Sequence, residues 1–330
     1  MYFWEWLMFD GRQKANYDEL TQRTELAKKE GRGTPTATVK QSLSATVTDN
    51  DSLYAYNDIY IDVRTPHDEK RGLITIFLGG GMAGVCYWCV KFLFLFAAWI
   101  RDGQDEGGNV LNGYAYAFMV LVALLFALIF FFFFKYVYRF LRLEAFTARR
   151  LIVRFNRVTR KVYLLRPKNI GGIVALDWEK TEAAVDRSML REVLPGGGFL
   201  ALGWDKGAVY DANGRPKDDF DMVFVGRSGL PGAELLAFWE YIRRYMEIGP
   251  QAAPPPKKLL SKIPWPWLSF QAAWNILPLR GLRDSGLWGA FVPIKLMLLA
   301  VTIIHTAGHW ISLLLCYEPK FPSAIEKAGQ

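Results

Sequence analysis

The chain has 330 residues, 52% of them hydrophobic, and its 40 basic residues outnumber its 32 acidic ones by eight. An excess this small does not indicate nucleic acid as a partner. In a chain with long apolar stretches it is typical of loops that lie beside anionic lipid. The three cysteines are too few for a disulfide framework, and because no basic start precedes an apolar run, we expect no removable signal peptide.

Residues 1–72 are predicted to form a cytoplasmic N-terminal region. The segment 18–29 has the composition of a helix, whereas 34–51 is rich in Thr, Ser and Asp and is predicted to be a loop. Residues 57–64 alternate apolar and polar side chains, which indicates a strand.

Two long apolar stretches follow. Residues 73–100 contain one charge, Lys91, and residues 112–134 contain none. A helix needs about 20 apolar residues to cross the hydrocarbon core, so both stretches are predicted to cross it, as a transmembrane hairpin over 73–142. A lysine at the centre of a span costs ~2.5–3.5 kcal/mol on insertion scales, so Lys91 is expected to lie near an interface or to be paired.

The first stretch also contains a glycine cluster, from Gly79 to Gly84. Its spacing matches a dinucleotide-binding pattern, but it lies inside an apolar stretch with no strand before it, so we expect no cofactor there. We predict instead that Gly80 and Gly84 form a packing seam between membrane helices.

The charges beside the two stretches predict their orientation. The loop 101–111 has one basic and three acidic residues, whereas 135–166 has ten basic residues and one acidic residue, Glu144. Because basic loops stay in the cytoplasm, we expect a bacterial inner-membrane protein with this loop in the periplasm and the regions on both sides of the hairpin in the cytoplasm. Six of the basic residues are also candidates to face anionic lipid: Arg149, Arg150, Arg154, Arg157, Arg160 and Lys161.

Residues 143–250 are predicted to form the folded domain. Strand patterns recur at 151–155, 161–165, 173–176, 181–185, 199–203, 208–210 and 222–225, with turn residues between them. A helix over 231–247 with one apolar face then closes the unit. This order of elements is that of a pleckstrin-homology-like β-barrel with a C-terminal helix. The expected fold class is therefore membrane α+β, and such a likeness predicts no ligand by itself.

Residues 251–286 are rich in Pro and Trp, and are predicted to be a stiff linker followed by an interfacial segment. The tryptophans lie either at the level of the lipid headgroups or against the barrel. Residues 287–330 comprise a third apolar stretch, 296–316, and a tail. If this stretch spans the membrane, the tail is periplasmic; if it is re-entrant or interfacial, the tail is cytoplasmic.

No catalytic, cofactor or metal site is expected. His305 and His309 lie on one face of the third stretch and could hold a metal, but no further ligand can be assigned, so hydrogen bonding between helices is favoured. The remaining histidine is His67. The acidic cluster at 218–221 is expected to be a solvated loop rim. None of the three apolar stretches contains Asp or Glu, which argues against an ion relay.

Several motifs carry a resemblance. They are residues 57–63, Arg71-Gly72, 154–157 with 161–163, 175–179, 239–247 and the tail 319–326, which together cover the chain from about residue 57 to its C-terminal end. They resemble a family of proteobacterial multi-pass membrane proteins encoded near type VI secretion effectors. At 321–322 this chain has Phe-Pro where the family pattern has Trp-Pro.

The resemblance implies either an immunity protein, which protects the producing cell from a membrane-targeting toxin, or an accessory protein of the secretion locus. We therefore expect a non-enzymatic immunity protein whose packed membrane helices bind a pore-forming toxin. Membrane lipids, the cognate toxin and a second copy of the chain are its expected partners. The alternative is a membrane-anchored sensing or scaffold module whose domain binds lipid headgroups or a protein segment.

Overall fold

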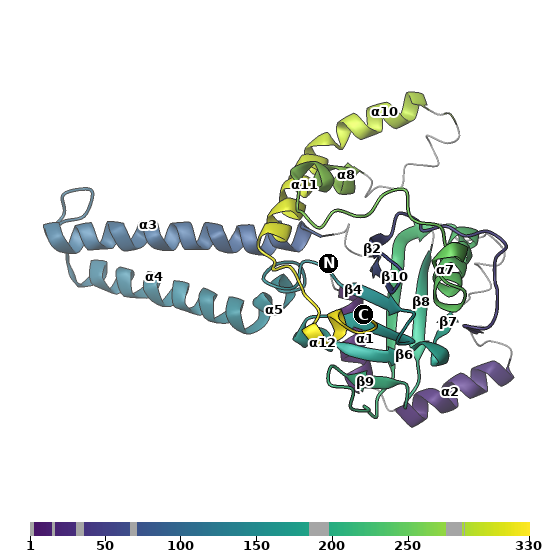
Figure 1. The fold of residues 1–330 in the computed structure, drawn as a ribbon. Helices are drawn as coiled ribbons and strands as arrows, with labels where there is room; N and C mark the ends of the chain where they lie inside the picture. The colour runs from purple at the N-terminus through teal and green to yellow at the C-terminus, as the bar shows by residue number, and fades with distance from the viewer. Residues whose placement is uncertain are drawn as a thin grey trace.

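The computed structural model describes residues 3–14, 17–30, 36–66, 71–184, 198–274, 286 and 288–330. A long helical hairpin extends from a folded α+β body; helices α8 and α11 lie where the two meet, and α10 extends away from the upper end of α11 (Figure 1). Two N-terminal helices, α1 (Phe3–Lys14) and α2 (Tyr17–Lys29), lie beside the body.

The hairpin consists of two nearly continuous helices. The first runs through a π-helical segment, Thr75–Gly80, into α3, Gly81–Asp102; the second comprises α4, Gly113–Phe132, a π-helical segment, Phe133–Val137, and α5, Tyr138–Leu141. The two helices have 28 and 29 residues, and only 6% of the apolar 18-residue stretch within each helix is buried. At ~1.5 Å per residue each is about 42 Å long, which exceeds the ~30 Å hydrocarbon core. The two long apolar helices predicted from the sequence are therefore confirmed.

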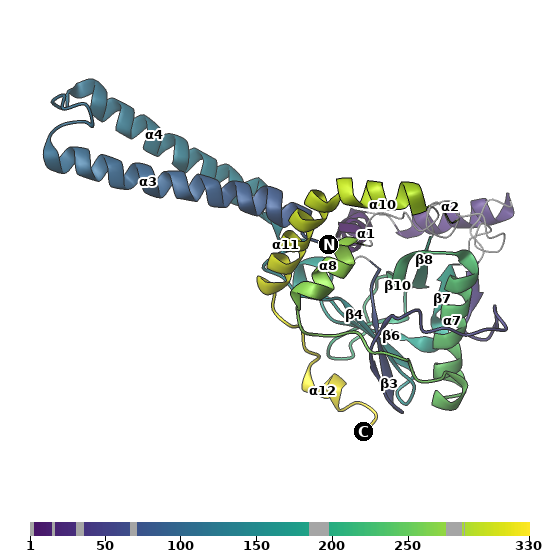
Figure 2. The ribbon, with the colours of Figure 1, turned by 90° about the horizontal axis from the view of Figure 1, so that it is seen from above.

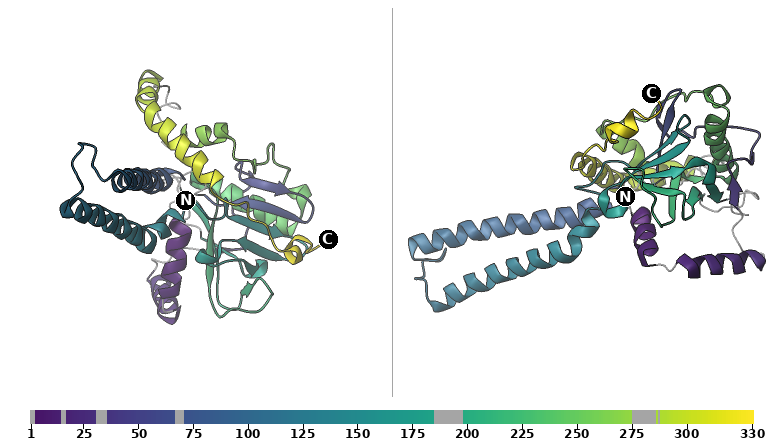
Figure 3. Two further views of the ribbon diagram at one scale, coloured as in Figure 1. Left: turned by 90° about the vertical axis from the view of Figure 1, so that its left-hand side faces the viewer. Right: turned by 60° about the horizontal axis from the view of Figure 1, so that its bottom comes forward.

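Aromatic side chains hold the two hairpin helices together. The ring centroids of Phe92 and Phe126 lie 6.0 Å apart, and those of Phe96 and Phe118 lie 6.2 Å apart in an edge-to-face arrangement. At the far end the chain reverses because Gly103 takes the left-handed conformation after α3, with φ 70°. The outer surface of the hairpin remains apolar and uncovered by the described chain (Figure 3).

Two antiparallel sheets form the body. Their strands are β1 (Thr36–Thr38), β2 (Leu53–Tyr56), β3 (Tyr60–Arg64), β4 (Ile152–Asn156), β5 (Lys161–Leu165), β6 (Val174–Asp177), β7 (Glu182–Ala184), β8 (Gly198–Trp204), β9 (Val209–Asp211) and β10 (Asp221–Leu230). The six-stranded sheet has the order β2-β3-β4-β5-β6-β9, and the four-stranded sheet has the order β1-β7-β8-β10. Among the described residues the sheets do not close into one barrel, so the predicted pleckstrin-homology-like barrel is not confirmed.

Segments from both sides of the hairpin share each sheet. β3 pairs with β4 from Tyr60 opposite Asn156 to Arg64 opposite Ile152, and β1 pairs with β7. The structure thus joins residues that the sequence analysis divided between 1–72 and 143–250, because strands before the hairpin supply backbone partners for strands after it. The hairpin is an insertion in one folded body, and its two ends leave the same end of the β3–β4 pair.

Helix α7, Gly232–Glu247, covers the core on the side of the body that faces away from the hairpin (Figure 2). Its Trp239 is fully buried and lies 5.7 Å from Trp178, centroid to centroid, and Trp178 in turn packs edge-on against Phe155. Large aromatic side chains remove much apolar area from water, so this stack joins β4 of the six-stranded sheet to the helix. The helix predicted at 231–247 is confirmed.

The third apolar stretch, 296–316, contains one helix, as predicted, and a second helix precedes it. The first of these is α11, Leu299–Leu314, and the preceding helix is α10, Trp288–Met297, with a break at Leu298. With 16 residues, α11 is about 24 Å long, too short to cross a ~30 Å core. Helix α8, Pro266–Trp274, packs against α11. Trp265 and Trp267 each expose more than half of their surface and do not pack on the body.

Candidate functional site

Two glycines bring α11 against the start of the hairpin. Gly72 has a φ of 112°, and a Cβ there would lie 2.3 Å from the backbone nitrogen of His309. A Cβ at Gly308 would lie 2.5 Å from the carbonyl oxygen of Gly72. No side chain fits at such distances, so glycine is required on both segments. The middle of α11 is therefore fixed at the level of the first hairpin turn, which begins at Thr75.

A buried carboxylate caps that first turn. Oε2 of Glu144 accepts hydrogen bonds from the backbone N–H groups of Gly72 and Thr75, both at 2.9 Å, and from the Thr75 hydroxyl at 3.2 Å. The first N–H groups of a helix have no partner within the helix, so an acidic side chain here stabilises the turn. Since Glu144 follows the second hairpin helix, its side chain links the two ends of the hairpin.

An arginine close to Glu144 extends the link to the C-terminal helices. Arg71 is fully buried, and it donates hydrogen bonds to the carbonyl oxygens of Glu144 and Arg149 and to Sγ of Cys316, the last at 3.2 Å. Cys316 in turn donates to the carbonyl oxygen of Glu144 at 3.2 Å. Both hairpin ends, the start of the sheet and the end of α11 thus meet in one polar cluster.

Helices α8 and α11 are joined by polar contacts. Nδ1 of His309 and Oγ of Ser269 are hydrogen-bonded at 2.9 Å, and the Trp310 indole donates to the carbonyl oxygen of Pro264 at 3.0 Å. The His305 and His309 rings lie 6.3 Å apart, centroid to centroid. In the part of the chain that the structure describes, no three His, Cys, Asp or Glu residues gather to hold a metal. His309 thus bonds between helices.

Both ends of the C-terminal helical segment are held on the body. Before it, the backbone N–H of Leu260 donates to the carbonyl of Leu53 at 2.8 Å. After it, Tyr317 exchanges backbone hydrogen bonds with Thr147 and Arg149, at 3.1 and 2.8 Å. A segment that starts and ends on one side cannot make a single crossing. The tail after α11 therefore lies against the body, beside the start of β4.

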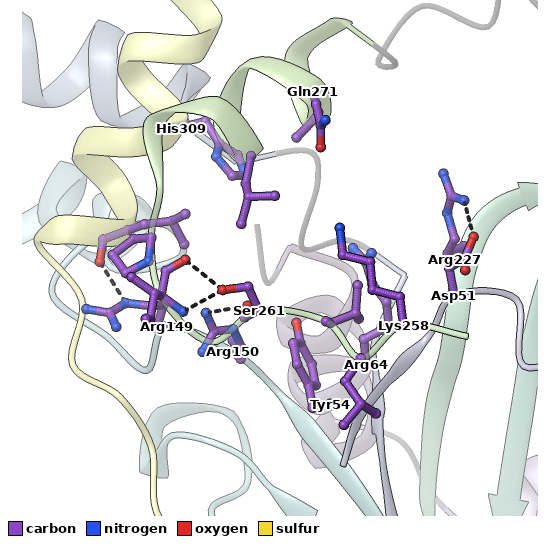
Figure 4. Close-up of a pocket in the computed structure, with 17 residues that line it drawn as sticks. Asp51, Tyr54, Arg64, Arg149, Arg150, Arg227, Lys258, Ser261, Gln271 and His309 are labelled. Carbon is purple, nitrogen blue, oxygen red and sulfur yellow. Dashed lines mark hydrogen bonds and ion pairs between the residues drawn. The ribbon is translucent and has the colours of Figure 1, made fainter. Parts of the chain in front are cut away.

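A cleft of about 380 Å³ lies between β2, the linker before α8, and helices α8 and α11 (Figure 4). Five cationic side chains line it: Arg64, Arg149, Arg150, Arg227 and Lys258. Its apolar lining includes Leu259, Leu260, Ile263, Leu268 and Leu313. Asp51 is the one acidic residue among the described residues of the lining. The cleft is therefore both basic and apolar, and we take it as the candidate functional site.

The cations of the cleft differ in what they contact. Arg149 and Arg150 both bind the carboxylate of Glu318 in the tail, at 3.1 and 2.7 Å, and their other N–H groups donate to backbone carbonyls. Arg227 lies 4.0 Å from Asp51, a long ion pair in which the acid is mostly exposed, so it neutralises the cleft only in part. Lys258 is exposed at the mouth.

The six basic residues predicted to face lipid are used within the fold. Arg149 and Arg150 line the cleft as described. Arg154 is buried, makes two hydrogen bonds to Asp62 at 2.7 and 2.9 Å, and stacks on the Tyr60 ring. Burial alone would lower the pKa of Arg154, but the hydrogen bonds and charge of Asp62 raise it above its ordinary value.

The other three basic residues lie at the surface but are also engaged. Arg157 donates to a backbone carbonyl of the β2–β3 turn at 3.1 Å, Arg160 pairs with Glu247 at 2.6 Å, and Lys161 pairs with Asp177 at 2.5 Å. Cations already held by carboxylates present little free charge. A continuous lipid-facing stripe is therefore not what the structure presents; two of the six, Arg149 and Arg150, line the cleft instead.

The predicted membrane residues lie on the hairpin. A Cβ at Gly80 or Gly84 would meet no described atom within 4 Å, so neither glycine mediates helix packing among the residues that the structure describes. Lys91 is exposed near the middle of the first helix, with its amine 5.2 Å from the centre of the Trp88 ring. This cation–π contact is the partner that the structure provides for Lys91.

The acidic cluster at 218–221 is structural. Asp221 is buried and makes two hydrogen bonds to Arg166, at 3.0 and 2.5 Å, while Asp218 lies 3.5 Å from Lys206 at the surface. His67 lies outside the described residues. The predicted absence of catalytic groups stays a prediction.

Sequence reasoning missed Arg64, Arg227 and Lys258, because three separate segments bring them together. It also missed Gly72 and Gly308 as the packing pair. One signal could have found the polar cluster around Glu144 and Arg71, since Glu144 is the single acid in the basic segment 135–166.

Comparisons with known proteins add no further evidence on identity. No protein family, curated protein or solved structure matches the chain. The resemblance to proteins encoded near secretion effectors stays a prediction.

Proposed function

We propose that this protein is a membrane-anchored binding module without catalytic activity. Its hairpin crosses the bacterial inner membrane and holds the body against the cytoplasmic face. The observation that carries the proposal is the cleft, in which five cationic side chains and an apolar lining meet at the base of the hairpin. A site of this kind suits an anionic ligand with an apolar part.

The charge distribution supports this orientation. The far turn of the hairpin contains Asp102, Asp105 and Glu106 beside one basic residue, whereas the second helix ends with Lys135, Arg139 and Arg142. Basic flanks stay in the cytoplasm, so the body would be cytoplasmic. Two sheets covered by one C-terminal helix also remain compatible with a pleckstrin-homology-like body, although a fold of this kind does not specify a ligand.

Protection against a membrane-targeting toxin is a second candidate function. Its supporting observation is the hairpin surface, where Gly80 and Gly84 have open space beside them and aromatic rings such as Phe94 are largely exposed. Small residues on a lipid-facing helix permit close approach of another membrane helix. In this role the toxin would bind along the hairpin, and the body would serve as its anchor.

One photo-crosslinking experiment in cells separates the two functions. A benzophenone amino acid at Gln271, in the cleft, is expected to form an adduct with the bound ligand. This adduct should disappear when Lys258 and Arg227 are changed to alanine. The same probe at Arg215, exposed on a remote turn, is the control. An adduct between the neighbouring effector and a probe at Phe94 would favour immunity. If Gln271 gives no more adduct than Arg215, the binding module is ruled out.

A further inference from the structure

We infer that the cleft binds one anionic membrane phospholipid, with its phosphate at Lys258, Arg227 and Arg64 and the start of an acyl chain between α8 and α11. This assignment rests on the proposed function and names the ligand of the same site. It follows from the position of the cleft, the order of its lining and its volume.

The cleft lies at the depth where headgroups would be. His309 lines it, and the backbone of His309 touches residue 72, three positions before the hairpin helix begins at Thr75. If the hairpin crosses the bilayer, its first turn lies where hydrocarbon meets water. The side chains of the cleft are then in reach of lipids, and a ligand could enter from the membrane.

The cleft has cationic side chains from β3, β10 and the linker, and further apolar side chains from α8 and α11. Figure 4 shows Lys258, Arg64 and Arg227 on the strand side, and Gln271 and His309 on the helix side. Leu268 and Leu313 line it from α8 and α11. An amphiphile with an anionic head and an apolar tail matches this order, because each part would meet a lining of its own kind.

The neighbouring arginines show which chemistry this region accepts. Arg149 and Arg150 already hold the two oxygens of the Glu318 carboxylate. A second oxyanion at Lys258 and Arg227 would lie beside this carboxylate and would gain from the positive field of the five cationic side chains. One carboxylate for two arginines leaves the cluster positive, and a phosphate would neutralise it further.

The volume limits how much of the lipid enters. About 380 Å³ is at the small end of ligand pockets, and holds a phosphoglycerol group and the first part of one chain. The rest of the acyl chains would lie on the exposed apolar surface of α10 and α11, to which Leu296, Met297 and Val301 contribute. A free phosphate or a nucleotide would leave the apolar side chains of the cleft exposed to water.

The test uses the full-length protein in detergent and three probes: dioctanoyl-phosphatidylglycerol, dioctanoyl-phosphatidylcholine and inorganic phosphate. A ligand of the native state raises the unfolding temperature by mass action. We expect a saturable rise with the anionic lipid and little with the other two. The double change Lys258→Ala with Arg227→Ala should weaken binding at least tenfold. Lys257→Ala, which removes one positive charge next to Lys258 but outside the lining of the cleft, should leave it within twofold.

A second variant keeps the charge and fills the apolar side. Ala272→Trp should abolish the rise, while the unfolding temperature without lipid reports whether the variant folds. An equal response to inorganic phosphate would overturn the assignment in favour of a soluble anion, and an equal response to phosphatidylcholine would remove its charge basis. Cleft adducts in cells without lipid binding would defeat the lipid assignment alone. Loss of both would also defeat the proposed function.

Discussion

Changing Gly308 to valine is expected to separate α11 from the hairpin and to lower the free energy of unfolding by about 3 kcal/mol, the upper end of ordinary overpacking costs. The reason is geometric. A Cβ at this position would lie 2.5 Å from the carbonyl oxygen of Gly72 and 2.7 Å from the Ile76 side chain, and backbone cannot give way as a flexible side chain can. Thermal unfolding of the detergent-purified protein measures the loss.

Gly289→Val is the matched control, because Gly289 lies in α10 and a Cβ there meets nothing within 4 Å. This variant should unfold within a few degrees of the unmodified chain. Equal unfolding temperatures for the two variants would show that α11 does not dock at the hairpin base. The position of the cleft, of which α11 forms one wall, would then be wrong as well.

Glu144→Ala is expected to destabilise the junction by about 1–3 kcal/mol, the cost of leaving buried hydrogen-bond donors without their acceptor. The change leaves the N–H groups of Gly72 and Thr75 without the acceptor that now binds both at 2.9 Å. It also removes the side-chain link between the two hairpin ends. Urea unfolding in mild detergent, followed by tryptophan fluorescence, measures the loss.

Two further variants serve as controls for Glu144→Ala. Glu144→Gln keeps an oxygen acceptor but no charge and should lose less than the alanine variant. Glu106→Ala removes a carboxylate at the exposed hairpin loop and should change the free energy of unfolding by less than about 0.5 kcal/mol, as surface substitutions do. A Glu144→Ala protein as stable as Glu106→Ala would mean that the polar cluster around Glu144 does not hold the two ends of the hairpin together.

The sequence predicts local structure better than it predicts the site. Apolar length identifies both hairpin helices, and alternation places β5 at Lys161–Leu165 with the bounds that the structure has. β1 and β2, with three and four residues, are too short for alternation to indicate, and β1 lies where a loop was predicted. Strand order along the chain also cannot tell that β3 pairs with β4 across an inserted hairpin, because that pairing is non-local.

The cleft depends on the same non-local pairing. Arg64 comes from β3, Arg227 from β10 and Lys258 from the linker, so no window of sequence contains two of them. The basic run 149–161 drew attention because it is continuous in sequence, yet its acidic partners, Asp62, Glu247 and Glu318, lie far away in the chain. Ion pairing with remote segments therefore hides charge that composition alone suggests is free.

Accessibility of single cysteines in cells tests the central claim, that the hairpin crosses the membrane while the body and the tail share one side. The background replaces Cys86 and Cys89 with alanine and Cys316 with serine. Single cysteines then go to Glu106, in the hairpin loop, and to Lys327, in the tail, both exposed. With the outer membrane permeabilised, an impermeant maleimide should label Glu106→Cys in intact cells and Lys327→Cys only after lysis. Labelling of Lys327→Cys in intact cells, or protection of Glu106→Cys, would contradict the account.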